Sequence, residues 1–218
     1  MKKLVIFDLD GTLVNTIADL GESTNHALRN LGYPTHDIPS YRFMVGNGIN
    51  KLFERALPEG QKTPENVLLM RKEFINYYDA HNLDQSHPYE GIPQLLRSLQ
   101  ERSLLLAVAS NKYHEATTKI IQKLFSEIHF IEIIGQQEGY PVKPDPSIVD
   151  RILSTAQVDK SEVLYVGDSG VDMNTALNAG VSACGVTWGF RPRTELEQFN
   201  PDFIVDNPAD ILTLVNPY

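Results

Sequence analysis

The chain has 218 residues, with 19 Lys and Arg against 28 Asp and Glu, so its formal net charge is −9. Its 42% apolar and 22% charged residues are typical of a globular protein with a sizeable core. Because nucleic-acid binding relies on Lys and Arg that neutralise phosphates, an acidic chain without a basic cluster argues against such a partner. The single cysteine, Cys184, excludes an intrachain disulfide and is typical of a reducing compartment.

Neither a signal peptide nor a membrane span is expected. The apolar run after Met1-Lys2-Lys3 is too short for a signal peptide and is interrupted by Asp8 and Asp10. No stretch approaches the roughly 18 apolar residues that a transmembrane helix needs. We therefore expect a cytoplasmic protein that does not associate with membranes.

The segment Leu4–Leu13, with the sequence LVIFDLDGTL, is the first with a clear chemical meaning. Its apolar start, rich in β-branched and aromatic residues, predicts a buried parallel strand. Side chains alternate along a strand, so Asp8 and Asp10 should point the same way where that strand ends. Two neighbouring carboxylates repel each other, and a divalent cation with oxygen ligands is their usual partner. The segment therefore predicts a metal-assisted carboxylate site.

Residues 16–85 have helical spacing and contain no convincing strand. The three predicted helices are Thr16–Leu31, Gly48–Leu57 and Pro64–Asn82, and Pro64 suits the first turn of the last one. The stretch SHPYEG at 86–91 is typical of a hinge that returns the chain to its starting domain. We predict an all-helical cap domain of residues 16–85, inserted into a core domain of residues 1–15 and 86–218.

The remainder of the chain alternates short apolar strands with helices. Such alternation predicts a doubly wound, Rossmann-like α/β core, in which a parallel sheet is covered by helices on both faces. Ligands bind such sheets beyond the carboxyl ends of the strands. The predicted strands are Leu104–Ala109, Phe130–Ile134, Val163–Val166, Val181–Val186 and Phe203–Val205, and the predicted helices are Ile92–Arg102, His114–Leu124, Pro146–Ala156, Val171–Ala179 and Ala209–Leu214.

Polar residues follow four predicted strands and should converge on one crevice if the sheet is parallel. They stand in the segments Asp8–Thr12, Ser110–Lys112, Lys143–Asp145 and Gly167–Asp172. Over the whole chain, this set resembles the haloacid dehalogenase superfamily of phosphohydrolases. That family begins with Asp-X-Asp-Gly-Thr, has a Ser or Thr after the second core strand and a distant Lys, and ends with an acidic pair of the Gly-Asp-X-X-X-Asp type.

The resemblance implies a division of roles between the first two carboxylates. Asp8 would be the nucleophile that forms an aspartyl-phosphate intermediate. Asp10 would be the general acid that protonates the leaving oxygen, and then the base that activates water. The phosphate group would be bound by Gly11, Ser110, Asn111 and Lys143, although Asn111 serves equally well as a cap of the following helix.

A magnesium site follows from the same resemblance. Asp8, the backbone carbonyl of Asp10, and Asp168 would hold the ion, and Asp172 would join or orient that shell. Charge supports this independently, because these four aspartates and a phosphate ester together outweigh the single Lys143. Mg²⁺ takes oxygen ligands and bridges carboxylates to phosphates, so it suits the excess of negative charge.

The predicted cap contains a second resemblance. Residues 43–52, FMVGNGINKL, resemble the Val-Gly-X-Gly loop of phosphoglycolate phosphatases, and Ser110-Asn111-Lys112 resembles their Thr-Asn-Lys. The loop would present Gly46, Asn47 and Gly48 to the leaving group. The flanking Arg42 and Lys51 would either meet a substrate carboxylate or remain surface charges. Asn15-Thr16 departs from the family's usual Asp-Ser or Asp-Thr at the entry to the cap.

These features predict Mg²⁺-dependent hydrolysis of a small phosphomonoester, with phosphoglycolate the leading candidate. Asp10 argues against a dehalogenase, whose halide leaves without a proton. It argues equally against a phosphonate hydrolase, which normally lacks the second Asp. A phosphosugar mutase, a pyrophosphatase and a non-catalytic phosphometabolite-binding protein remain open alternatives. The sequence does not indicate an oligomeric state.

Overall fold

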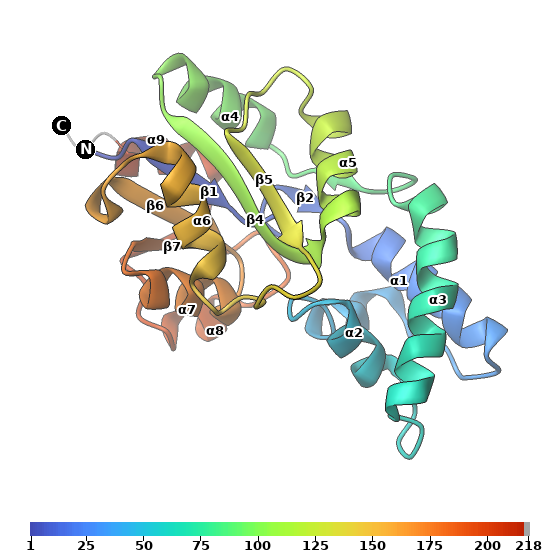
Figure 1. Cartoon of the computed structure of the whole chain (residues 1–218). Helices are drawn as coiled ribbons and strands as arrows, with labels where there is room; N and C mark the ends of the chain where they lie inside the picture. The colour runs from blue at the N-terminus through green and yellow to red at the C-terminus, as the bar shows by residue number, and fades with distance from the viewer. Residues whose placement is uncertain (216–218) are drawn as a thin grey trace.

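The computed structural model describes residues 1–215. Its centre is a parallel sheet of six strands in the order β5-β4-β1-β6-β7-β8 (Figure 1). The chain builds outward from the central β1 through β4 and β5, and then crosses over to add β6, β7 and β8. This doubly wound topology confirms the predicted fold class. The strands are β1 (Leu4–Phe7), β4 (Leu105–Tyr113), β5 (Glu132–Gln136), β6 (Val163–Gly167), β7 (Ser182–Val186) and β8 (Phe203–Val205).

Helices cover both faces of this sheet because alternate strand residues point to opposite faces. Val5 and Phe7 pack in one apolar cluster with α4 (Ile92–Glu101), α5 (His114–Leu124) and α9 (Ile211–Val215). Leu4 and Ile6 pack in the other, with side chains of the remaining three helices. Those helices are α6 (Ser147–Ala156), α7 (Gly170–Ala179) and α8 (Arg193–Glu197). Burial on both faces accounts for the continuous apolar run of β1.

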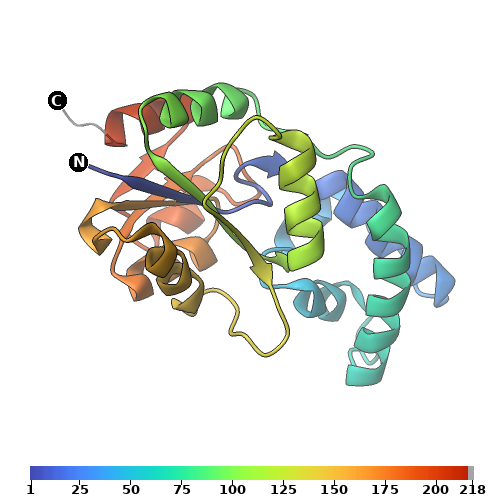
Figure 2. The ribbon, with the colours of Figure 1, turned by 45° about the horizontal axis from the view of Figure 1, so that its top comes forward.

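A helical segment lies beyond the carboxyl ends of β4 and β5, apart from the sheet (Figures 1 and 2). It consists of α1 (Ile17–Asn30), the 3₁₀ helix η1 (Ile38–Phe43), α2 (Ile49–Ala56) and α3 (Pro64–His81). These helices bury a third apolar cluster of their own, in which Leu28, Tyr41, Phe53, Phe74 and Tyr78 are buried. Two residues of the sheet region, Ala116 and Phe190, join this cluster.

The helical segment is joined to the sheet region by a two-stranded ribbon. The short strands β2 (Val14–Asn15) and β3 (His87–Pro88) pair antiparallel, one at each end of the segment. Beside them, the buried carboxylate of Asp19 accepts hydrogen bonds from the backbone amides of Gln85 and Ser86 and from the Ser86 hydroxyl, at 2.6–3.1 Å. Two-residue strands carry no periodicity, so sequence analysis did not predict this ribbon.

Strand β4 is longer than predicted. It continues past Ala109 through Ser110-Asn111-Lys112 to Tyr113, with a shift in its register against β5. These polar residues are buried, and their side chains have partners within the protein. The predicted strand end at Ala109 was therefore wrong, because the prediction followed only the apolar run. Three further elements were also not predicted: η1, the 3₁₀ helix η2 (Lys160–Glu162) and α8. Among residues 1–215, no helix combines the length and the apolar character that crossing a membrane would require.

We expect Asp19→Ala to lower the free energy of unfolding by about 2–4 kcal/mol, because buried donors at Gln85 and Ser86 would lose their acceptor. Urea unfolding measures this change. The matched control is Asp84→Ala, which removes an exposed carboxylate paired only with His81 and should change stability by less than about 0.5 kcal/mol. Equal effects of the two substitutions would contradict the anchoring role of Asp19.

Candidate active site

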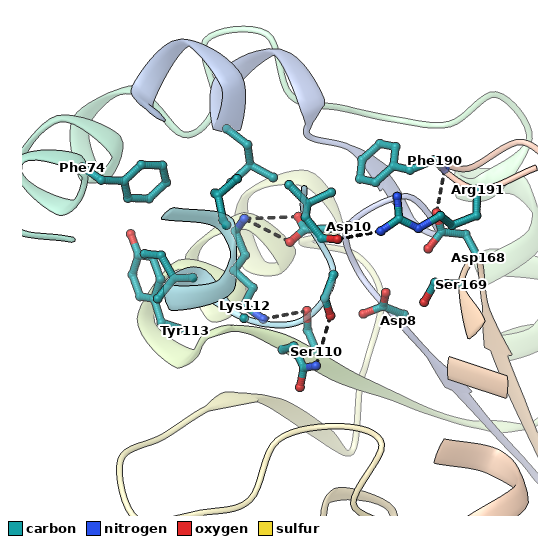
Figure 3. A pocket seen from close by; sticks show the side chains of 17 residues that line it. Asp8, Asp10, Phe74, Ser110, Lys112, Tyr113, Asp168, Ser169, Phe190 and Arg191 are labelled. Carbon is teal, nitrogen blue, oxygen red and sulfur yellow. Dashed lines mark hydrogen bonds and ion pairs between the residues drawn. The ribbon is translucent and has the colours of Figure 1, made fainter. Parts of the chain in front are cut away.

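A pocket lies between the carboxyl ends of the central strands and the helical segment (Figure 3). From the sheet region it is lined by Asp8, Asp10, Ser110, Asn111, Lys112, Tyr113, Asp168, Ser169, Phe190 and Arg191. From the helical segment it is lined by Leu20, Val45, Gly46, Gly48, Ile49, Leu52 and Phe74. The sheet therefore supplies most of the polar groups and the helices most of the apolar ones. The pocket stands where the strand order reverses, which is the usual ligand position in this class of sheet.

Lys143 does not line the pocket; it is buried between two carboxylates, one of which belongs to the pocket residue Asp8. Its ammonium is 2.9 Å from Asp8 Oδ1 and 2.7 Å from Asp172 Oδ1, and it also donates to the carbonyl of Ala109 at 2.9 Å. The Lys143 side chain is only 2% exposed. A buried charge is tolerated when it is paired and hydrogen-bonded, and Lys143 meets both conditions.

Burial shifts the protonation of these groups. It raises the pKa of Asp8 to about 7, with a further increase from Asp172 and an opposing decrease from Lys143. Burial alone would lower the pKa of Lys143, but Asp172 and Asp8 outweigh it and hold that pKa well above its usual value. Burial, followed by the charges of Asp172 and Asp8, also raises the pKa of Asp168 well above its usual value. Together, these carboxylates carry more negative charge than the single buried lysine offsets.

Asp172 is fully engaged by neighbouring groups. Besides Lys143 on Oδ1, its Oδ2 accepts the backbone amide of Ser169 at 3.2 Å and the Ser169 hydroxyl at 2.6 Å. These bonds form the capping box that begins α7. Both oxygens of Asp172 therefore have protein partners, and the contact of Oδ1 orients the Lys143 ammonium.

The Asp168 side chain packs directly against the backbone of two glycines, where any larger residue would collide with it. Its Oδ2 accepts the backbone amide of Phe190 at 2.6 Å. A β-carbon at Gly11, whose φ is +90°, would lie 2.3 Å from Asp168 Oδ2, and one at Gly189 would lie 2.3 Å from Asp168 Cβ. Gly11 and Gly189 therefore let the backbone approach this carboxylate closely.

Asp8, Asp168 and Asp172 can together hold a metal ion. Each offers a carboxylate oxygen, and the three oxygens lie within 4.8 Å of one another. All three residues are buried, and a hard divalent cation would offset their excess charge with ligands of the preferred type. The donor set fits such a cation, with Asp172 as its most engaged member. The Asp10 carboxylate is not part of this group, and ligation by its backbone carbonyl stays a prediction.

The carboxylate of Asp10 points to a different set of partners. The Thr16 hydroxyl donates to Oδ1 at 2.7 Å, and the Lys112 ammonium lies 3.2 Å from both oxygens. In Figure 3, Lys112 reaches across the pocket to Asp10, while Asp8, Asp168 and Ser169 lie together on the other side. The two carboxylates thus pair with different lysines: Asp8 with Lys143, and Asp10 with Lys112.

Ser110 and Asn111 both line the pocket, but Asn111 does not cap α5, whose N-cap is Tyr113. Its side chain accepts the backbone amide of Lys143 at 2.8 Å and donates to the Lys143 carbonyl and the Gly46 carbonyl, both at 3.1 Å. Asn111 therefore fixes the backbone of Lys143 and bridges it to the helical segment. Ser110 Oγ accepts the amide of Lys112 at 3.2 Å.

The predicted loop at 42–51 reaches the pocket only in part. Gly46 and Gly48 line it, but Arg42, Asn47 and Lys51 do not. Lys51 lies on the exposed face of α2 and pairs with Glu54 at 2.5 Å, and Asn47 accepts a hydrogen bond from Arg55 at 2.7 Å. These polar side chains are thus satisfied on the outer side of the loop.

Sequence analysis expected Lys112 in the crevice without giving it a role, and it did not single out Arg191. Arg191 donates to the carbonyls of Arg42 and Val45, and so ties the loop after β7 to the helical segment. The position of Arg191 after an apolar strand was an available signal, as was the Ser-Asn-Lys triplet for Lys112. Phe190 is buried and also lines the pocket.

A pocket lined by carboxylates lies at the carboxyl ends of a doubly wound parallel sheet. This arrangement is typical of α/β enzymes. Comparison with known proteins identifies the family. The model for haloacid dehalogenase-like hydrolases matches residues 5–186, and the chain belongs to this family.

Relatives match the chain over nearly its whole length. The phosphoglycolate phosphatase of Haemophilus influenzae is 32% identical, covering 98% of each chain, and that of Vibrio cholerae is 31% identical, covering 98% of this chain and 96% of its own. A crystal structure of a predicted phosphoglycolate phosphatase from Haemophilus somnus is 30% identical with a TM-score of 0.91, covering 99% and 98% of the two chains. A Lactobacillus delbrueckii structure has a TM-score of 0.93 at 27% identity over all of both chains. The chain is an enzyme of this hydrolase family, and these curated relatives are phosphoric monoester hydrolases.

The raised pKa of Asp8 predicts a pH-dependent effect of a divalent cation on stability. The pKa of Asp8 is about 7 in the folded protein and about 3.9 in the unfolded chain. Between these pH values the native state keeps a proton that the unfolded chain has lost. The free energy of unfolding without metal should therefore fall as pH rises through this window. Because a cation binds ionised carboxylates, MgCl₂ should raise the melting temperature more at about pH 8 than at about pH 5. Thermal unfolding with MgCl₂ and with EDTA measures this, and equal shifts at both pH values would contradict it.

Proposed function

We propose that this protein hydrolyses a small phosphomonoester in two steps through a phosphoryl group carried on Asp8. The observation that carries this proposal is the setting of Asp8 at the end of β1. Its Oδ1 is paired with Lys143, whereas Oδ2 accepts no hydrogen bond from residues 1–215 and belongs to a residue that lines the pocket. An oriented carboxylate with one uncommitted oxygen is suited to nucleophilic attack.

In the first step, a carboxylate oxygen of Asp8 attacks phosphorus and forms an acyl phosphate as the ester P–O bond breaks. The ester oxygen takes the electron pair of that bond and a proton from Asp10, and leaves as an alcohol. In the second step, water attacks phosphorus and gives a proton to Asp10, and inorganic phosphate leaves Asp8. Lys143 offsets the negative charge of the phosphoryl group beside Asp8 throughout.

A magnesium ion completes this assignment. Asp8 and Asp168 would hold it, with the backbone carbonyl of Asp10, and Asp172 would orient Lys143 and the start of α7 beside it. The ion would supply the positive charge that phosphoryl transfer requires and that Lys143 alone does not provide. Gly11, Ser110 and Asn111 would surround the phosphate, with Ser110 donating its hydroxyl.

Residues 16–85 would act as a cap over the site. Leu20, Val45, Leu52 and Phe74 give the pocket an apolar roof, and the β2–β3 ribbon is a natural hinge. A closed apolar roof would exclude bulk water during attack on phosphorus. This arrangement favours a small substrate. Phosphoglycolate is the leading candidate, because relatives of that name match the chain from end to end.

A phosphate-release assay over small esters tests the proposal. With MgCl₂ we expect release from phosphoglycolate, loss of activity in EDTA, and a decrease of at least about 10³-fold in kcat for Asp8→Asn, which retains shape but not the nucleophile. The matched control is Asp150→Asn, an exposed carboxylate on α6, which should retain full activity.

Each contrary outcome has a distinct meaning. Activity that survives Asp8→Asn would contradict transfer to Asp8. Release from none of the esters would contradict the hydrolase assignment. Movement of phosphate between two sugar hydroxyls without release would instead indicate a mutase.

A further inference from the structure

Two basic side chains line the pocket, in addition to the buried Lys143 that contacts Asp8 from outside the lining. They are Lys112 at the end of β4 and Arg191 after β7. Each of the three cations has an acidic partner: Asp8 and Asp172 for Lys143, Asp10 for Lys112, and Glu195, at 3.5 Å, for Arg191. In the proposed reaction Asp10 gives up and takes back a proton. Its contact with Lys112 is therefore the one that catalysis affects most directly.

Asp10 has no free oxygen in this structure. Thr16 and Lys112 both contact Oδ1, and Lys112 also lies 3.2 Å from Oδ2. A carboxyl group that is to donate a proton to an ester oxygen needs one oxygen that carries the proton and faces the substrate. An ammonium group donates hydrogen bonds and accepts none, so it competes for the same oxygens. If Lys112 moves away from Asp10, Oδ2 loses its protein partner and is free to face the leaving oxygen.

Lys112 is buried, so its ammonium needs a negatively charged partner wherever it lies. Its side chain is 3% exposed, and its ammonium lies 4.8 Å from the centre of the Tyr78 ring on α3. A ring face stabilises a cation only weakly compared with an anion. An ammonium that leaves Asp10 in so buried a place needs another negative group, and the substrate is the available source.

We propose that Lys112 exchanges its partner during the reaction, from Asp10 in the empty enzyme to an anionic group on the leaving-group side of the substrate. The exchange makes Lys112 a specificity-determining residue for phosphomonoesters whose alcohol carries a carboxylate close to the ester oxygen. Esters with an uncharged alcohol leave Lys112 on Asp10 and are poor substrates. This inference rests on the proposed hydrolysis and extends it to the class of alcohol.

Arg191 is less suited to this role. Its two terminal nitrogens donate to the carbonyls of Arg42 and Val45, and its Nε faces Glu195. None of these partners takes part in proton transfer, so catalysis does not require their release. Arg191 therefore serves to hold the cap loop against the sheet region.

Two non-hydrolysable ligands test the recognition directly. In 3-phosphonopropionate a methylene group replaces the ester oxygen of phosphoglycolate, and propylphosphonate has a methyl group in place of its carboxylate. We expect wild-type enzyme with MgCl₂ to bind 3-phosphonopropionate about 10- to 100-fold more tightly than propylphosphonate in calorimetry. Lys112→Met should remove most of that preference, Lys112→Arg should retain part of it, and the exposed Lys62→Met should retain all of it.

Kinetics test the exchange itself. Lys112→Met should lower kcat/KM for phosphoglycolate about 10- to 100-fold more than it lowers kcat/KM for ethyl phosphate. A merely structural lysine would lower both equally, and that result would overturn the inference. If Lys112→Met does not fold, Lys112→Gln serves in the same comparison.

The outcomes separate this inference from the function beneath it. Absence of phosphate release by the wild-type enzyme from every ester would contradict the hydrolase. Wild-type hydrolysis of phosphoglycolate with an unchanged ligand preference in Lys112→Met would contradict the inference alone. A preference that disappears in Arg191→Met and persists in Lys112→Met would assign recognition to Arg191 and overturn the role given to Lys112.

Discussion

The site depends on the ammonium of Lys143, which lies between the buried carboxylates of Asp8 and Asp172. Lys143 follows β5 in a loop without regular structure, so its position needs outside support. Asn111 provides this support by accepting the Lys143 amide and donating to the Lys143 carbonyl. Asp172 then fixes the side chain, while its other oxygen accepts from Ser169 at the start of α7. The ends of three strands are thus coupled through one cation.

This coupling leaves the site short of positive charge. Burial raises the pKa of both Asp8 and Asp168, because the single lysine among them does not balance three carboxylates. A nucleophilic Asp8 must nevertheless be ionised. A divalent cation held by Asp8 and Asp168 would restore the balance, which is why the metal and the nucleophile share a residue in the proposed mechanism. Asp10 lies outside this group, and its carboxylate contacts Lys112 instead of Lys143.

The parts of the fold that follow from local patterns were predictable from the sequence. The continuous apolar run of β1 marks a strand buried on both faces. Because β1 ends at Phe7, strand alternation does not align Asp8 with Asp10, and their carboxylates have different partners. The positions of Ser110 and Asp168, near the carboxyl ends of the two strands that flank β1, follow from parallel topology. These inferences need only periodicity and the rule that carboxyl ends of parallel strands meet at one edge.

Features that arise from contacts between distant segments were not predictable. The partner of Lys112 depends on how β4 approaches the Asp10 turn, and that of Arg191 depends on how the helical segment is seated. Lys51 and Asn47 were placed near the pocket because the loop around them was correctly expected there. Their side chains point elsewhere because Glu54 and Arg55 offer nearer partners. Loop position can therefore be read from a motif, whereas side-chain direction requires the packed structure.

The central claim is that phosphate passes through Asp8, and rapid acid quenching during a single turnover of phosphoglycolate with MgCl₂ tests it most directly. Peptide mass spectrometry of the quenched protein should find a phosphoryl group on Asp8 that rises and then decays as inorganic phosphate is released. Phosphate release with no phosphorylated Asp8 at any quench time, or with the phosphoryl group on another residue, would contradict the account.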